Sequence, residues 1–341
     1  MDRNYVVDVI WEGYGVPMYT PIPPSMPAYV HPEIRPDGTL EELCHLYNLT
    51  EAARILNTTD TSPADGKPDF PINQTTGWRF WDRNGDGLEQ ADEYLELIYY
   101  IRKDDPLRLE LGLWHAEQIK AVQIRALTEI HWIQECLKAV TIEHNFHLYT
   151  GSWGLGTDPD HLVLWHSDYY WYPGFCYNYG AVNCSDFNQW VDKLLYANTF
   201  AEAKHAALKA QEAFCSDDCI GCIPTVCPME FKAVQRRYTG GTGGTSVEPD
   251  DGENQYRDLN WTGIVNVPVY GVDNFWSFLN MHPEGYLIGD GENMTVRWGF
   301  KVDNIKKLNP VYSEWVWDWN VLNLIYESLL VRDPYTHEWM P

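Results

Sequence analysis

The 341-residue sequence predicts an α/β fold, with mixed sheets flanked by helices. The first observation is an apolar run at 94–101, which is apolar enough to form a strand inside a sheet. The second is helical periodicity at 109–123 and again at 132–142, followed by a strand pattern at 144–153. Strands that alternate with helices in this way are typical of α/β folds.

Local signals predict the remaining elements. Residues 15–36 carry seven prolines, which indicates an extended or irregular segment. Thr39 and Glu42 have capping-box spacing, so a helix is expected from this point toward Leu56. The other predicted segments are a polar loop at 60–78, helices at 187–196 and 200–214, an acidic loop at 240–255, short strands at 264–270 and a linker at 282–293.

The chain is strongly acidic, with a net charge of −25. This charge argues against nucleic acid or anionic lipid as a partner. No apolar run reaches the ~20 residues that a membrane helix needs, and the opening sequence shows no signal-peptide pattern. The sequence has no G-x-S-x-G, H-E-x-x-H or phosphate-loop motif, and no set of residues fills the roles of a catalytic site. We therefore expect a protein that is not an enzyme.

Cysteines and glycosylation sequons indicate an oxidising, extracellular environment, in which disulfides persist. The sequon asparagines are Asn48, Asn57, Asn73, Asn183, Asn260 and Asn293. The cysteines are Cys44, Cys136, Cys176, Cys184, Cys215, Cys219, Cys222 and Cys227. The spacing of the last four fits neither a ferredoxin nor a paired zinc motif, so two local disulfides are expected there. The other expected pairs are Cys176 with Cys184 and Cys44 with Cys136.

The strongest local motif is a calcium loop at 82–93, which matches D-x-[DN]-x-[DN]-G-x5-E in full. The expected oxygen ligands of Ca²⁺ are Asp82, Asn84, Asp86, the carbonyl of Leu88, Gln90 and Glu93. Gly87 supplies the sharp turn. A strand follows the loop, so the ion is expected to hold a loop in place and not to move a pair of helices. The alternative is an Asp/Asn/Gly turn that binds no ion.

Six passages of the chain stand in an order that carries a family resemblance. They lie at 9–29 (VIWEGYGVPMYTPIPPSMPAY), 49–57, 82–87, 147–162 (HLYTGSWGLGTDPDHL), 187–214 and 266–281 (NVPVYGVDNFWSFLNM). Together they resemble the later lobes of the extracytoplasmic solute-binding proteins of oligopeptide/dipeptide ABC importers, known as family 5. The resemblance implies periplasmic-binding-protein-like lobes, a peptide or other small solute as ligand, an ABC permease as membrane partner, and a location outside the cell or at its surface.

The resemblance also places the ligand near the GSW passage. In many such receptors an Asp three residues after the Trp binds the amine of the peptide, but the matching position after Trp153 is Gly156. Asp158 and Asp160 lie just beyond and are candidates to replace it, although Asp158 also suits a helix N-cap. The expected aromatic walls are Trp153, Tyr169, Tyr170, Trp171 and Trp276, for each of which core packing is the alternative.

Residues 294–341 resemble the opening of such a receptor, although they stand at the end of the chain. The chain is therefore expected to be incomplete as a single receptor. The expected parts are a third-lobe-like domain at 1–238, return strands at 239–285, a linker at 286–293 and a first-lobe-like segment at 294–341. The alternative function is an extracellular filament or surface-layer protein that reuses this fold, with other copies of itself joined through the C-terminal segment.

Overall fold

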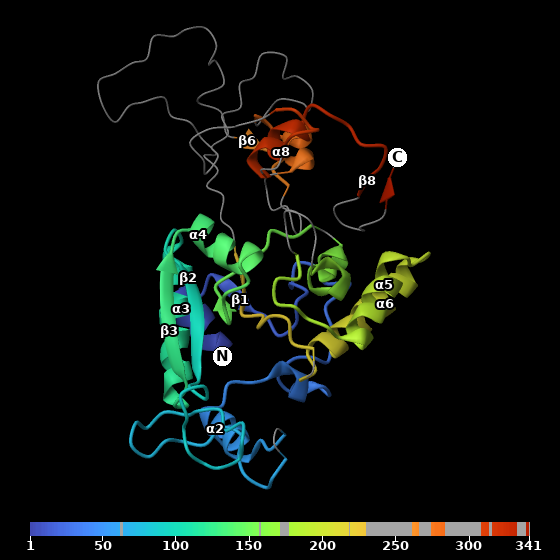
Figure 1. Cartoon of the computed structure of the whole chain (residues 1–341). Helices are drawn as coiled ribbons and strands as arrows, with labels where there is room; N and C mark the ends of the chain where they lie inside the picture. Colours follow the sequence, from blue (N-terminus) through green and yellow to red (C-terminus); the bar gives the residue numbers. More distant parts are fainter. Residues whose placement is uncertain are drawn as a thin grey trace, which may run out of the picture. The chain divides into compact units, whose positions relative to one another are not determined.

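The computed structural model of the chain contains two compact units, Met1–Met229 and Glu230–Pro341 (Figure 1). The structure describes residues 1–61, 64–156, 158–170, 177–217, 219–229, 261–265, 274–283, 308–313, 316–332 and 339–340. The predicted boundaries after residues 238, 285 and 293 fall outside these ranges and stay predictions. Within these ranges, each helix is too short or too polar to cross a bilayer.

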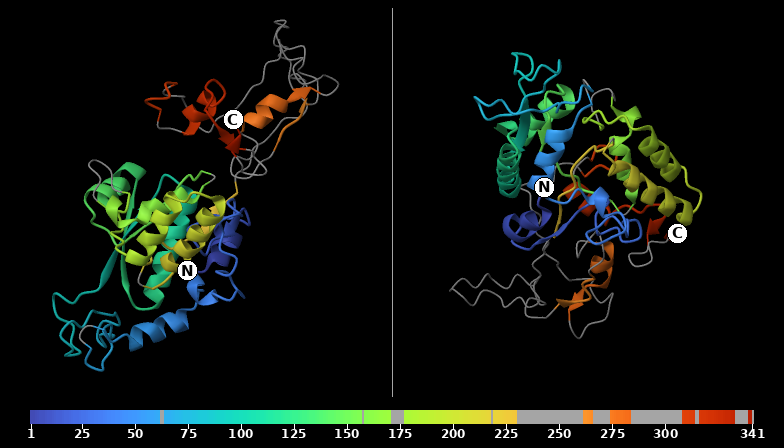
Figure 2. Two further views of the ribbon diagram at one scale, coloured as in Figure 1. Left: turned by 90° about the vertical axis from the view of Figure 1, so that its right-hand side faces the viewer. Right: turned by 90° about the horizontal axis from the view of Figure 1, so that it is seen from below.

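A three-stranded parallel sheet organises one side of the first unit. Its order is β3 (Arg125–His131), β2 (Glu96–Arg102) and β4 (Leu148–Tyr149). Helix α3 (Pro106–Ala121) connects β2 to β3, and α4 (Ile133–Leu137) with the π-helix η3 (Lys138–Ile142) leads on toward β4. In Figures 1 and 2 this sheet and the hairpin of α5 and α6 lie on opposite sides of the unit. The predicted α/β class is confirmed.

The sheet packs against α3 through a small apolar core. Tyr99 and Ile101 of β2 are 3% and 0% exposed, and Ala116 of α3 is buried beside them. Gly112 allows the close approach, because a Cβ at that position would lie 2.6 Å from the side chain of Ile101. Asp105 caps the helix by accepting hydrogen bonds from the backbone N–H groups of the first turn at 3.1 and 3.3 Å.

His115 of α3 makes this core sensitive to pH. Its Nδ1 lies 3.3 Å from the Tyr99 hydroxyl, and burial lowers the pKa of the imidazole from 6.5 to about 4. The folded state therefore binds the proton less well than the unfolded state does. The contribution of His115 to the unfolding free energy is therefore fully present above pH 6.5, and it is lost as the pH falls toward about 4.

We expect His115→Gln to remove this part of the acid sensitivity. Between pH 7 and pH 5 the original chain should lose about 2 kcal/mol more of its unfolding free energy than the variant loses. Urea unfolding at the two pH values measures the difference. Equal losses in both proteins would show that His115 is solvated in the folded state.

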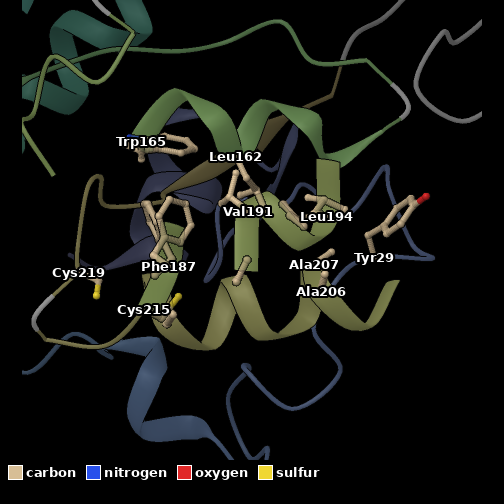
Figure 3. Packing of buried hydrophobic residues seen from close by; sticks show 14 of the residues in the cluster. Tyr29, Leu162, Trp165, Phe187, Val191, Leu194, Ala206, Ala207, Cys215 and Cys219 are labelled. Carbon is tan, nitrogen blue, oxygen red and sulfur yellow. The ribbon is translucent and has the colours of Figure 1, made fainter. Parts of the chain in front are cut away.

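A second, larger core is formed by helices on the other side of the unit. Helix α5 (Ser185–Leu195) and helix α6 (Phe200–Phe214) pack together beneath the 3-10 helix η4 (Pro159–Trp165). Phe187, Phe214 and Leu162 are almost fully buried, and the two phenylalanine rings lie 5.4 Å apart (Figure 3). Ala206, Ala207 and Ala210 of α6 are buried as well, and their small side chains permit close helix contact.

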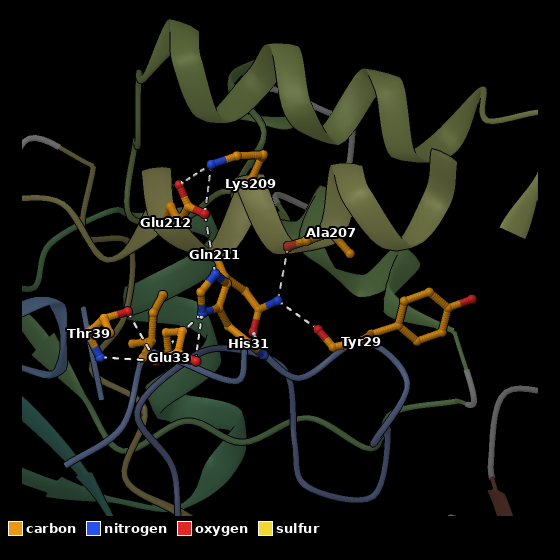
Figure 4. A network of polar contacts seen from close by, with 9 residues as sticks. Tyr29, His31, Glu33, Thr39, Ala207, Lys209, Gln211 and Glu212 are labelled. Carbon is orange, nitrogen blue, oxygen red and sulfur yellow. Dashed lines mark hydrogen bonds and ion pairs between the residues drawn. The ribbon is translucent and has the colours of Figure 1, made fainter. Parts of the chain in front are cut away.

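The proline-rich segment is ordered because a buried glutamine holds it. Gln211 of α6 is 0% exposed, and its Nε2 donates to the carbonyls of Tyr29 and Ala207 at 2.8 and 3.0 Å (Figure 4). Its Oε1 accepts from the backbone N–H of His31 at 3.1 Å. The His31 ring in turn contacts Glu212 at 3.2 Å. This network fixes an extended segment of the kind that the prolines predict.

The other elements are short. In the first unit they are α1 (Arg3–Tyr5), the π-helix η1 (Val6–Ile10), the antiparallel pair β1 (Gly15–Pro17) and β5 (Val226–Pro228), the 3-10 helices η2 (Glu41–Cys44) and η5 (Ser167–Tyr169), and α2 (Leu49–Thr58). In the second unit they are β6 (Trp261–Thr262) paired with β7 (His282–Pro283), α7 (Phe275–Asn280), α8 (Val316–Leu322) and β8 (Val331–Arg332) paired with β9 (Trp339–Met340).

Two predicted elements are wrong in extent. The helix expected from Thr39 ends after one turn, because His45 adopts a left-handed φ of 45°. The helix that follows has Asn48 as its N-cap, which accepts from the Glu51 N–H at 3.0 Å. The strand predicted at 144–153 is reduced to β4, because only Leu148 and Tyr149 pair with β2.

The predicted disulfide pairings are wrong for the described cysteines. Cys184 bonds to Cys219 and not to Cys176, which lies outside the described residues. The cause is the hairpin: α5 and α6 run side by side after a short turn, so the residue before α5 meets the residues after α6. Cys44 and Cys136 are not bonded to each other, because Cys44 lies in the helical core cluster and Cys136 lies outside it in α4. Cys215, Cys222 and Cys227 also form no local disulfide in this structure, since Cys219 is bonded to Cys184.

Candidate functional site

The carboxyl ends of the parallel strands form the candidate ligand site. The chain leaves β2 through α3 toward β3 on one side, whereas β4 lies on the other side of β2. In open α/β sheets, ligands bind outside the carboxyl ends of strands where the strand order reverses in this way. The residues directly after β2 include Asp104, Asp105 and Arg108, and those after β4 are Thr150, Gly151, Ser152 and Trp153.

Arginines and hydroxyls cross-link these two strand ends. The backbone N–H of Arg102 donates to Thr150 Oγ1 at 3.0 Å. Its side chain pairs with Asp104, and this hydrogen bond holds the pKa of the carboxyl below its usual value. Arg108 pairs with Asp105 at 3.1 Å and donates to the Ser152 hydroxyl through Nη2. Its buried Nη1 has no hydrogen-bond partner among the described residues, so this edge contains one donor that lacks an acceptor.

Trp153 stands at the same edge with an exposed ring. It stacks on Tyr179 with ring centroids 6.1 Å apart and planes 18° apart, and it remains 37% exposed. Tyr179 also contacts Phe146, 6.1 Å away. Gly151 lets the chain pass close to the Tyr149 ring, since a Cβ there would lie 3.2 Å from it. A tryptophan held in place with much of its surface exposed suits ligand contact better than core packing.

The structure places the other predicted ligand residues in different surroundings. Tyr170 packs against His144 at 5.3 Å, and Tyr169 meets Tyr177 edge to face at 6.2 Å. Asp158 takes the N-cap position of η4, and Asp160 is exposed in that helix. Trp171 lies outside the described residues, and Trp276 belongs to α7 of the second unit, where it contacts Phe275 at 5.7 Å.

Two surface hollows in the first unit contain none of these residues. One, of about 500 Å³, is lined by parts of the segment from Pro17 to Arg35. The other, of about 520 Å³, lies on α3 around Leu113 and Trp114. Both are open to solvent.

The predicted calcium loop has a compact carboxylate cluster. Oxygen atoms of Asp82, Asp86 and Glu93 lie within 4.8 Å of one another. Asp82 accepts from the backbone N–H groups of Asp86 and Gly87 at 3.1 and 2.8 Å. Glu93 accepts from the N–H groups of Arg83 and Gln90 at 3.0 and 3.1 Å. The loop thus folds its backbone around the carboxylates, as the glycine turns at φ 71° and 76° allow.

Within the described residues two cations meet this loop away from its buried carboxylates: Lys67 Nζ donates to the Gly85 carbonyl, and Arg125 pairs with Glu89 at 3.2 Å. Asp82 and Glu93 are 2% and 3% exposed, yet neither forms an ion pair there. Buried like charges this close are unfavourable unless a cation lies between them. The Asn84 and Gln90 amides also lie at the cluster, bonded to Asp86 at 3.1 and 2.8 Å. A set of hard oxygen donors with these spacings fits Ca²⁺.

Backbone bonds join the two flanks of the loop, and the predicted strand follows as β2 from Glu96. The Trp81 N–H donates to the Glu93 carbonyl at 2.9 Å, and Phe80 forms an antiparallel bridge with Tyr94. The ends of the loop are therefore already joined, which suits an ion that stiffens the loop.

Among the described sequon asparagines, Asn48, Asn57 and Asn183 are exposed and Asn73 is half-buried. Asn183 is exposed directly before the Cys184 disulfide. Asn57 accepts from buried Arg79 at 2.9 Å, and Asn73 donates to Glu89 at 2.6 Å. Asn260 and Asn293 lie outside the described residues.

No family model and no curated protein matches this sequence. Solved structures do match it. The periplasmic oligopeptide-binding protein of an ABC transporter from Thermotoga maritima, solved with mannohexaose, is 14% identical with a TM-score of 0.55, over 84% of this chain and 48% of that one. NikZ from Campylobacter jejuni in complex with Ni(L-His) is 14% identical with a TM-score of 0.51, over 66% of this chain and 39% of that one. The chain thus spans less than half the length of either, and the shared feature is the fold.

Proposed function

We propose that this chain, which has the fold of the solute-binding proteins of ABC importers, is a non-catalytic solute-binding component that works outside the membrane with an ABC permease. The observation that carries the proposal is Trp153, which is exposed after the carboxyl end of β4 and follows Ser152, the residue that Arg108 contacts. Solute sites of this kind join apolar walls to a few fixed polar groups.

The chemistry of the edge favours a solute with both an apolar and an anionic or hydroxyl part. The Trp153 ring offers an apolar surface, and the partly exposed Arg108 guanidinium offers positive charge to a carboxylate or hydroxyl. A short peptide carries both features. Gly156 gives no carboxylate for a peptide amine, so Asp158 or Asp160 would have to supply it.

We also propose a structural Ca²⁺ ion in the loop at 82–93. Asp82, Asp86 and Glu93 would hold it with carboxylate oxygens, and Asn84, Gln90 and the Leu88 carbonyl are within the same loop. The ion would neutralise buried charge and take no part in solute chemistry.

Native mass spectrometry of the full chain tests solute binding. The probes are a tripeptide library, Ni²⁺ with L-histidine, and mannohexaose, the latter two being ligands in the matched structures. We expect an adduct with at least one probe, most readily a peptide, and roughly tenfold weaker binding after Trp153→Ala because a stacking surface is lost. Tyr196→Ala, which removes an aromatic side chain that is 80% exposed at the end of α5, should bind as the original chain does.

The proposal fails if Trp153→Ala and the original chain bind every probe equally. A ladder of multimers without any adduct would instead favour the structural-protein alternative.

A further inference from the structure

Three thiols that belong to no disulfide in this structure gather at the edge of the helical core. Cys44, at the end of η2, is 0% exposed, and Cys215, at the C-cap of α6, is 4% exposed. Both belong to one apolar cluster, against which Cys222 packs (Figure 3 shows Cys215). Cysteines 171 positions apart in the sequence thus share one core.

Arg3 ties the segments that carry these thiols. Its Nε donates to the Pro224 carbonyl at 2.8 Å, and its Nη1 donates to the His45 carbonyl at 3.3 Å. Its guanidinium lies 4.9 Å from the centre of the Tyr19 ring. The buried Arg3 therefore anchors His45, which follows Cys44, and Pro224, which follows Cys222 by two residues.

A direct contact joins the neighbourhoods of Cys44 and Cys215. The side chain of His45 donates from Nε2 to the Cys215 carbonyl at 2.7 Å. The Cys215 thiol points to the Tyr19 carbonyl, with a separation of 3.6 Å. A residue adjacent to Cys44 is thus hydrogen-bonded to the backbone of Cys215, as expected for segments close enough to cross-link.

We propose that Cys44 and Cys215 form a second disulfide, which joins η2 to the end of α6. This disulfide depends on the proposed function, because its formation needs an oxidant and such an oxidant is present outside the membrane. The two thiols lose two protons and two electrons, and a low-molecular-weight disulfide such as oxidised glutathione is reduced to two thiols. One cysteine first attacks that disulfide as a thiolate, and the second then displaces the glutathione thiolate from the mixed disulfide.

Cys215 has Cys222 as a second possible partner, but Cys44 is the better one. Cys222 is less buried, and the loop from Cys215 to Cys222 already contains the Cys219 anchor. Once formed, a bond from Cys44 would close a much longer loop and would therefore stabilise the folded chain more than a bond from Cys222 would. Burial raises the pKa of Cys44 to about 11 and that of Cys215 to about 12, so both thiols are protonated once the core has closed. Oxidation is therefore expected during folding and not afterwards.

Peptide mapping without reduction tests the pairing. The full chain is refolded in a buffer of oxidised and reduced glutathione, its remaining thiols are alkylated, and the digest is analysed by mass spectrometry. We expect one peptide that links Cys44 to Cys215, absent in Cys44→Ser and Cys215→Ser and retained in Cys136→Ser, which removes another buried thiol. The oxidised chain should also melt roughly 5–10 °C above Cys44→Ser.

Each outcome of the peptide map bears either on the Cys44–Cys215 bond or on the proposed location. Alkylated Cys44 in the refolded chain, or Cys44 linked to any cysteine other than Cys215, overturns the pairing. If either serine variant does not fold, Cys44→Ala and Cys215→Ala replace it, and the map of the original chain decides by itself. A linked peptide after refolding but alkylated thiols in protein isolated from its source would leave the geometry intact and count against the proposed location.

Discussion

Millimolar Ca²⁺ should raise the melting temperature of this chain by roughly 8–16 °C, and Asp82→Asn or Glu93→Gln should abolish the rise. A ligand that binds only the folded state stabilises it by about 4 kcal/mol when its free concentration is about 1,000 times Kd. The effect is expected to be large because Asp82 and Glu93 are buried and lack an ion pair among the described residues. Each substitution removes one charged ligand of the ion.

A matched control lies inside the same loop. Asp92 is exposed and stands beside Glu93 at a position that supplies no ligand, so Asp92→Asn should keep the calcium response. Differential scanning calorimetry in Ca²⁺ and in EGTA gives the comparison. An original chain that melts at the same temperature in both solutions would show that the loop is a turn without an ion.

Gln211→Leu should lower the unfolding free energy by about 2–5 kcal/mol. The substitution leaves the Tyr29 carbonyl and the His31 N–H without the partners that hold them at 2.8 and 3.1 Å. Each group is buried and would lose its hydrogen bond without gaining water. The extra apolar contact of leucine is worth less than these two losses, so the sign of the change is destabilising.

Urea unfolding measures this change, with Gln189→Leu as the control. Gln189 is exposed on α5, so its substitution should change stability by about 0.5 kcal/mol or less. A Gln211→Leu variant as stable as the control would mean that the proline-rich segment is held by its apolar contacts alone.

Elements with strong local patterns could be predicted from the sequence. The apolar run that forms β2 and the periodicity of α3 are visible in single windows, and both predictions are confirmed. β3 was not predicted, because its sequence RALTEIH mixes charged and apolar residues. Only its pairing with β2, from Glu96↔Arg125 to Arg102↔His131, makes it a strand.

In the candidate sites, too, only the residues that belong to a local sequence pattern could be predicted. The calcium loop lies within twelve successive positions, so its motif names every residue that the structure gathers. Trp153 could be named from the resemblance, but Arg108 and Tyr179 could not, because only the strand order and the packing bring them to the same edge. Their only signal in the sequence is that Arg108 follows a predicted strand.

The disulfide between Cys184 and Cys219 encloses the whole α5–α6 hairpin, including the turn at 196–199 that carries the exposed Tyr196. A protease that cuts this turn would not release a fragment, because both halves remain covalently joined outside the cut. The nicked chain would keep its apparent mass on a gel until a reducing agent is added. Cleavage of this turn would therefore cost the molecule its chain continuity but not its helical core.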